Sequence, residues 1–62
     1  MVTDKLKTLG LTNTNCFQYY RCEIIYIQRG RYFPTIASGY KDAAVCDTLE
    51  QAHKWIDEKK KQ

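Results

Sequence analysis

A short apolar run that leads directly into an amphipathic helix is the feature that most constrains this chain. Residues 43–46 form the run, and a helical pattern follows Asp47. The apolar residues of that pattern are Leu49, Ala52, Trp55 and Ile56. Their spacing places them in one stripe along a helix. We expect Asp47 to cap the helix and Glu50 to complete a capping box. The pattern predicts a helix over residues 48–60 that needs a surface to cover.

Residues 16–28 are rich in tyrosine, isoleucine and phenylalanine, which favour β-strands, and we expect one long strand there. Successive side chains of a strand point to opposite faces. One predicted face carries Tyr20, Cys22, Ile24 and Tyr26. This face is apolar or weakly polar, so we assign it to the core under the helix. The other predicted face carries Phe17, Tyr19, Arg21, Glu23, Ile25, Ile27 and Arg29.

Turn signals after this strand predict an antiparallel arrangement. Arg29-Gly30 indicates a tight hairpin turn, and residues 31–37 indicate the returning strand. Pro34 has no N–H to donate, so we expect this strand to lie at an edge or to be irregular there. Residues 38–42 suggest a second turn before a short strand over 43–46. The predicted class is α+β, with a β-hairpin or three-stranded antiparallel sheet and one C-terminal helix packed on one face.

The chain has 62 residues, enough for one domain. We assign residues 1–15 to an N-terminal arm or short helix that stops at Gly10, and residues 16–62 to a single sheet-and-helix domain. Residues 1–11 carry charges and lack an apolar core, so no secretion signal is expected. No apolar run reaches membrane-spanning length. Three cysteines cannot form a closed disulfide set. We therefore expect a cytoplasmic protein with reduced thiols and no membrane contact.

The sequence contains no convincing catalytic, metal or cofactor motif. His53 is the only histidine, and its place beside the apolar stripe favours a structural role over a general base. The possible zinc ligands are Cys16, Cys22, Cys46 and His53. Cys16 and Cys22 lie about 20 Å apart on a continuous strand, which excludes a shared ion. We expect no enzyme, no metal, no cofactor and no small-molecule substrate.

Residues 20–58 resemble the DNA-binding domains of plant ethylene-response-type transcription factors and the amino-terminal arms of phage integrases. The similarity lies in Gly30-Arg31-Tyr32 of the hairpin, in residues 47–52 (Asp-Thr-Leu-Glu-Gln-Ala), and in Ile56-Asp57 of the helix. The resemblance implies a three-stranded sheet with a helix on one face. It also implies that the other face of the sheet lies in the DNA major groove.

The function that we expect first is protein binding on the open face of the sheet. The residues predicted to form this site are Phe17, Ile25, Ile27 and Phe33. An apolar face of this kind needs a cover. The cover could be the N-terminal arm through Leu6, Leu9 and Leu11, a second copy in a homodimer, or a foreign protein. A small regulator or inhibitor of the kind that phages and mobile elements encode fits this description.

The alternative function is sequence-tolerant binding of nucleic acid on the same face. Ten lysines and arginines against seven aspartates and glutamates give a net charge of +3. The residues predicted to contact phosphates and bases are Tyr19, Arg21, Arg29, Arg31 and Lys41. Arginine and lysine position a protein on phosphates, and exposed aromatic rings stack on bases. The isoleucines of the face favour the first function.

Overall fold

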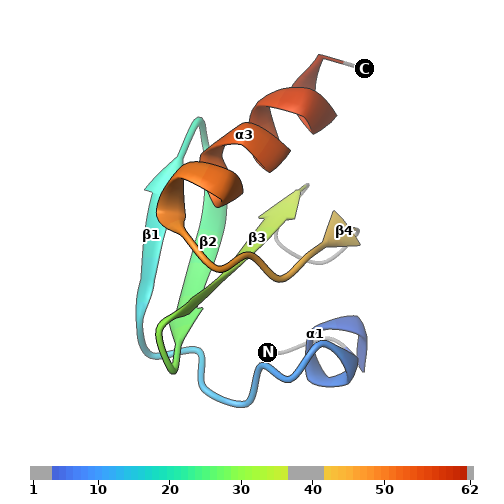
Figure 1. Ribbon diagram of the computed structural model, residues 1–62. Coiled ribbons are helices and arrows are strands. Elements are labelled where there is room, and N and C mark those ends of the chain that lie inside the picture. Colours follow the sequence, from blue (N-terminus) through green and yellow to red (C-terminus); the bar gives the residue numbers. More distant parts are fainter. Residues whose placement is uncertain (1–3, 37–41, 62) are drawn as a thin grey trace.

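Residues 4–36 and 42–61, which the computed structural model describes, form four antiparallel strands between two helices (Figure 1). In chain order the elements are α1 (Asp4–Thr8), β1 (Phe17–Tyr20), β2 (Glu23–Gln28), β3 (Arg31–Ile36), β4 (Asp42–Ala43) and α3 (Leu49–Lys60). The strands neighbour one another in the order β1-β2-β3-β4. The predicted α+β class is confirmed, with a fourth strand in the sheet. Most of the predicted turn over 38–42 lies outside the described residues.

The single strand predicted over 16–28 is in fact two strands, because the chain turns at Arg21 and Cys22. These residues have φ angles of 52° and 70°. Two consecutive positive φ angles are typical of a type I′ hairpin turn. Neither residue is a glycine or asparagine, so no sequence signal marked the turn.

The turn changes which residues of β1 and β2 lie on the same face of the sheet. Tyr20 lies opposite Glu23, and Tyr19 lies opposite Ile24. Directly opposed residues point to the same side of a sheet. Tyr20 therefore shares its face with Ile25 instead of Ile24.

The predicted hairpin turn at Arg29 and Gly30 is confirmed. The two residues have φ angles of 52° and 74°. The strands on either side pair with Gln28 opposite Arg31. β3 thus lies inside the sheet, between β2 and β4, although it contains a proline.

Pro34 is accommodated where the ladder between β3 and β4 is interrupted. Ala44 N donates a hydrogen bond to Pro34 O at 3.2 Å. Further along, Tyr32 and Cys46 exchange backbone bonds of 2.9 and 2.7 Å. Proline has no N–H to complete the pair with Ala44. The ladder therefore consists of the short β4 and a separate bridge between Tyr32 and Cys46.

The predicted helix is confirmed as α3, but its cap lies one residue later than expected. Thr48 Oγ1 accepts a hydrogen bond from Gln51 N at 3.1 Å, and Gln51 Oε1 accepts one from Asp47 N at 3.1 Å. Thr48 also has the extended backbone of an N-cap residue. The capping pair is therefore Thr48 and Gln51, and the prediction of Asp47 and Glu50 is wrong. Both pairs have the same spacing, so the pattern alone did not separate them.

α3 covers the face of the sheet that carries Ile25. Ile25, Ala52 and Ile56 form a buried cluster between the sheet and the helix. The partly buried residues around this cluster are Tyr20, Tyr32, Ile36, Cys46, Leu49 and Trp55. The predicted packing of the helix on Ile24 and Tyr26 is wrong, because the first turn exchanges the two faces.

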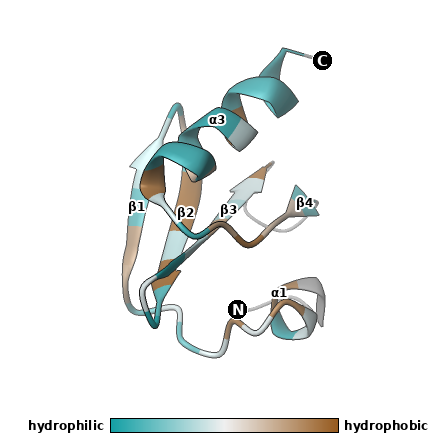
Figure 2. Ribbon diagram, in the orientation of Figure 1, coloured by the Kyte–Doolittle hydropathy of each residue, from teal (hydrophilic) through white to brown (hydrophobic). Residues whose placement is uncertain are grey.

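The N-terminal segment covers the opposite face of the sheet. Leu6 and Leu11 are fully buried, in a second cluster with Tyr26, Phe33 and Ala43. Figure 2 shows hydrophobic residues in the strands and in the segment between β4 and α3, while α3 itself is mostly hydrophilic. The chain therefore covers each face of the sheet in part, with α3 on one side and the N-terminal segment on the other.

The path of the N-terminal segment is fixed by a helix stop at Gly10. Its φ angle is 103°, which glycine adopts without a side-chain clash. Gly10 N donates to Lys7 O at 3.0 Å, and Leu11 N donates to Leu6 O at 2.9 Å. These two bonds form a Schellman motif, in which the first residue beyond the glycine often packs back on the helix. The motif turns Leu11 onto the sheet beside Leu6, and the predicted stop is confirmed.

Gln28 fastens the segment that follows. Its Oε1 accepts hydrogen bonds from Thr12 N at 2.7 Å and from Asn13 N at 2.6 Å. Its Nε2 donates to Gly10 O at 2.6 Å. One side chain of β2 thereby holds three backbone groups of the linker to β1, those of Gly10, Thr12 and Asn13.

Candidate functional site

The four residues predicted to form a protein-binding face do not share a surface. Ile25 is buried under α3, whereas Phe33 is buried under the N-terminal segment on the other face of the sheet. Ile27 is half-buried. Phe17 keeps 45% of its surface exposed. The prediction of one open apolar face is wrong, because Ile25 and Phe33 are buried on opposite faces, and Phe17 alone of the four remains exposed.

Phe17 and Tyr19 form an exposed aromatic pair on β1. Tyr19 is 70% exposed, and its ring meets that of Phe17 edge to face, with centroids 5.4 Å apart. On its other side Phe17 contacts the buried Tyr26 at a centroid distance of 6.3 Å. Edge-to-face contacts are a favourable arrangement of aromatic rings. Phe17 is therefore anchored on the core, and Tyr19 extends from it into solvent.

The backbone polar groups of the same two residues point away from the sheet. Ile27 N donates to Cys16 O at 2.9 Å, which makes these two residues a hydrogen-bonded pair. Hydrogen-bonded pairs alternate with non-bonded pairs along an antiparallel ladder. Phe17 and Tyr19 each belong to a non-hydrogen-bonded pair with β2. Their backbone N–H and C=O groups therefore point away from β2, toward the outer edge of the sheet. Among the described strands, none lies beyond that edge.

The edge at β1 is less protected than the edge at β4. β4 has only two residues and contacts α1. β1 has four residues, Phe-Gln-Tyr-Tyr, without a charge or a proline. Proteins commonly protect edge strands with charges, prolines or bulges. This uncharged edge is the site that sequence reasoning missed, because the strand was counted as part of a longer one. The absence of charge between Asn15 and Arg21 was the available signal.

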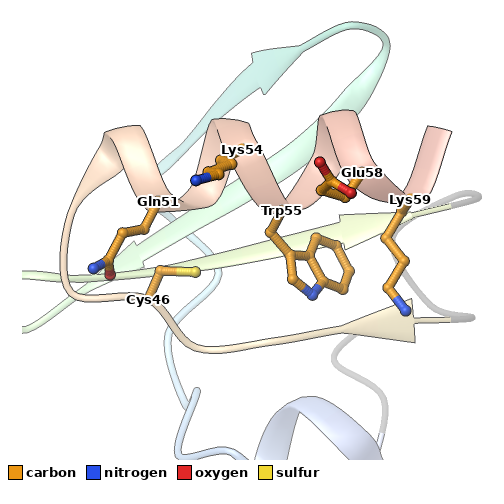
Figure 3. Close-up of a pocket in the computed structure, with 6 residues that line it drawn as sticks. All are labelled: Cys46, Gln51, Lys54, Trp55, Glu58 and Lys59. Atoms are coloured by element: carbon orange, nitrogen blue, oxygen red, sulfur yellow. The ribbon is translucent and has the colours of Figure 1, made fainter. Parts of the chain in front are cut away.

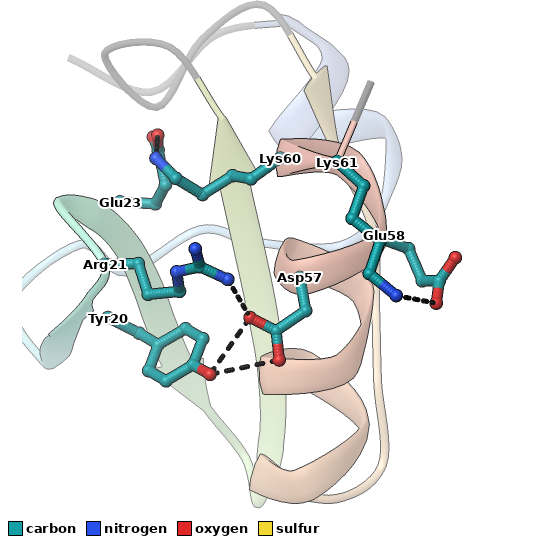
Figure 4. A network of polar contacts seen from close by, with 7 residues as sticks. All are labelled: Tyr20, Arg21, Glu23, Asp57, Glu58, Lys60 and Lys61. Carbon is teal, nitrogen blue, oxygen red and sulfur yellow. Dashed lines mark hydrogen bonds and ion pairs between the residues drawn. The ribbon is translucent and has the colours of Figure 1, made fainter.

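Arg21, one of the predicted phosphate contacts, is paired within the chain. Its Nη1 lies 2.7 Å from Asp57 Oδ1, and Tyr20 Oη donates to both oxygens of that carboxylate at 3.1 Å (Figure 4). The Arg21 hydrogen bond is the main cause that lowers the pKa of Asp57. Nearby, Lys60 Nζ lies 2.9 Å from Glu23 Oε2. These pairs attach the first hairpin turn to the C-terminal half of α3.

Arg29 and Arg31 lie at the opposite end of the hairpin from Arg21. Both are exposed, and no ion pair with either is found within the described residues. They line a cleft of about 380 Å³ together with Leu9, Gly10, Gln28 and Phe33. Lys41, the remaining predicted phosphate contact, lies outside the described residues. The structure therefore separates Arg21 from the other two arginines.

A shallow groove runs along α3 on the side of the β4 segment (Figure 3). Its volume is about 450 Å³, and its lining consists of Cys46, Gln51, Lys54, Trp55, Glu58 and Lys59. Lys59 Nζ lies 5.5 Å from the centre of the Trp55 ring and 3.0 Å from Asp42 Oδ2. The lysine is thus engaged with an aromatic ring and a carboxylate of its own chain. Charged side chains border the groove, so it is a weaker docking surface than the edge of β1.

The candidate zinc ligands lie in separate places. Cys16 is exposed before β1, Cys22 is exposed in the first turn, and Cys46 is half-buried next to α3. Burial, with a smaller effect of the adjacent Asp47, raises the pKa of the Cys46 thiol. His53 stacks on a tyrosine ring at 3.9 Å. Within residues 4–36 and 42–61, no three potential ligand side chains come together as a metal site.

In the part of the chain that the structure describes, the fold is that of a small α+β protein whose less protected sheet edge is β1. Comparison of the chain with protein-family models, with curated proteins and with solved structures gives no match. None of the helices that the structure describes is long and apolar enough to cross a membrane.

Proposed function

We propose that this chain is a small non-enzymatic regulator or inhibitor that acts by binding another protein through the outer edge of β1. The observation that carries the proposal is the coincidence, at Phe17 and Tyr19, of exposed aromatic rings and outward-facing backbone groups. An extended segment of a partner can add to such an edge as a further strand. Main-chain hydrogen bonds would provide affinity, and the two rings would provide the apolar contact.

A cytoplasmic setting of the kind found for regulators of phages and mobile elements is part of the proposal. It is supported by the free thiols, because Cys16 and Cys22 are exposed and an oxidising compartment would expose them to disulfide formation. The non-enzymatic part is supported by the polar cluster at α3. The Asp57 carboxylate is held by Tyr20 and Arg21, and its lowered pKa makes it a weak proton acceptor.

Binding of nucleic acid is the second candidate, favoured by the cleft with Arg29 and Arg31. Two exposed guanidinium groups beside one cleft suit a phosphate backbone. In the DNA-binding domains that the sequence resembles, the sheet face away from the helix meets DNA. Here the N-terminal segment covers the corresponding face, and Arg21 is bound to Asp57. These contacts leave the protein-binding edge as the better supported site.

The two functions are separated by titrating ¹⁵N-labelled protein with two probes. The first probe is a capped peptide of alternating threonine and valine, and the second is a generic duplex DNA. Edge binding predicts that the peptide shifts the amide signals of Phe17 and Tyr19, and that Tyr19→Lys abolishes the shift. Lys54→Ala, an exposed change on α3, serves as the matched control.

The opposite result is equally well defined. If the peptide leaves both amides unchanged while duplex DNA binds, the nucleic-acid function replaces the proposed one. Two arginine contacts would give a slope of about −2 for the logarithm of the binding constant against the logarithm of salt concentration. Arg29→Ala or Arg31→Ala would then each reduce that slope by about one.

A further inference from the structure

We infer that the strand recognised by the edge of β1 is β1 of a second copy of this chain, paired antiparallel about a two-fold axis through Gln18. The inference rests on the proposed use of this edge and adds the identity of the partner. It would join the two sheets into one continuous sheet across the axis. The dimer would be isologous, with the same surface contributed by both copies.

The bonding groups of the edge are arranged to complement themselves. The backbone N–H and C=O groups of Phe17 and Tyr19 face outward from the edge, and the two residues lie on either side of Gln18. In an antiparallel pair centred on Gln18, Phe17 of each copy comes opposite Tyr19 of the other. Each such pair exchanges N–H···O=C bonds in both directions. Every outward-facing backbone group of these two residues thereby gains a partner, without any shift of the strand.

The side chains are compatible with the same register. Phe17 and Tyr19 already pack edge to face within one chain. The pairing places Phe17 against Tyr19 of the second copy on that same face of the sheet. Aromatic pairs that lie directly opposite across strands stabilise a sheet. Because Phe17 rests on Tyr26, the aromatic surface would continue from one core to the other.

The charges of the strand also favour a second copy over a charged foreign segment. β1 itself is uncharged, so self-pairing brings no like charges together along the strand. The nearest charged residue is Arg21, which is bound to Asp57 of its own chain. In this register Arg21 comes opposite Asn15 of the second copy. The two Gln18 side chains meet at the axis, where amides can both donate and accept hydrogen bonds.

The register makes a specific prediction for disulfide trapping. In the proposed dimer, Gln18 of one copy lies opposite Gln18 of the second copy in a non-hydrogen-bonded pair. The Cα atoms of such a pair lie about 4.5 Å apart. This separation falls inside the range of disulfide bonds, about 4.4–6.8 Å. Gln18→Cys is introduced after Cys16→Ser, Cys22→Ser and Cys46→Ala. Mild oxidation should convert this variant to a covalent dimer. The control carries Lys54→Cys in the same background, on the exposed face of α3, and should remain monomeric.

Light scattering and amide hydrogen exchange on the unmodified chain complete the experiment. We expect a mass that rises from monomer to dimer with concentration, and exchange at Phe17 and Tyr19 that slows in parallel. Tyr19→Lys should keep the circular dichroism spectrum and lose the dimer. A monomer at every concentration, with fast exchange at both amides and equal oxidation of the two cysteine variants, would overturn self-pairing. The peptide titration then still decides whether the edge binds protein, because it does not depend on dimerisation.

Discussion

Replacing Leu11 by alanine tests whether the N-terminal segment is part of the core. Leu11 is fully buried, and the change removes three side-chain carbons from contact with the sheet. At about 0.8 kcal/mol per buried carbon, the transfer term alone is about 2.4 kcal/mol. The cavity left behind adds to this cost, within the range of about 2–5 kcal/mol seen for such changes.

This cost is large for so small a chain. At about 0.05–0.15 kcal/mol per residue, the 62 residues would have a total stability of about 3–9 kcal/mol. A loss of 2.4 kcal/mol should lower the melting temperature by about 10–20 °C. A loosely attached segment would instead fray independently, and truncating Leu11 would then change the melting temperature very little.

The assay is urea unfolding followed by both Trp55 fluorescence and circular dichroism. Trp55 lies on the helix side of the sheet, so it reports whether a change on the other face destabilises the whole domain. We expect a lower midpoint with an unchanged slope and coincident transitions by both probes. Lys7→Ala, an exposed change in α1, is the control and should stay within about 0.5 kcal/mol. If Leu11→Ala matched that control, the segment would not belong to the cooperative core.

Two further predictions concern α3. Thr48→Ala should lower the free energy of unfolding by about 1 kcal/mol because it removes the cap, whereas Asp47→Ala should change it by no more than about 0.5 kcal/mol. Thermal melts of both variants measure the difference. A larger loss in Asp47→Ala than in Thr48→Ala would contradict the cap assignment. Asp57 contributes stability that is present above its unfolded pKa of about 4 and is lost as pH falls through its lower folded pKa. Urea midpoints measured from pH 6 downward should therefore fall less steeply in Asp57→Asn than in the unmodified chain, and parallel curves would show that the Arg21 contact adds nothing.

Local features of the sequence were sufficient to place several elements. The stripe of Leu49, Ala52 and Ile56 predicted α3, because an apolar spacing of three and four residues fits one face of a helix. Gly10 and Gly30 marked a helix stop and a hairpin turn, because both positions need a positive φ. These are properties of a few neighbouring residues, and the chain carries them wherever its other parts lie.

The positions of the two covers and of the open edge required the tertiary structure. Arg21 and Cys22 adopt positive φ angles that neither residue favours by itself, and long-range contacts such as that of Arg21 with Asp57 hold the turn. Because a strand alternates with period two, this turn moved Ile25 from the predicted open face to the core. Burial depends on contacts between segments distant in the chain. The alternation of side chains along each strand therefore separated its two faces. Packing between distant segments decided that α3 covers Ile25 and that Leu6 and Leu11 cover Tyr26. It also decided that Phe17 and Tyr19 remain at an edge.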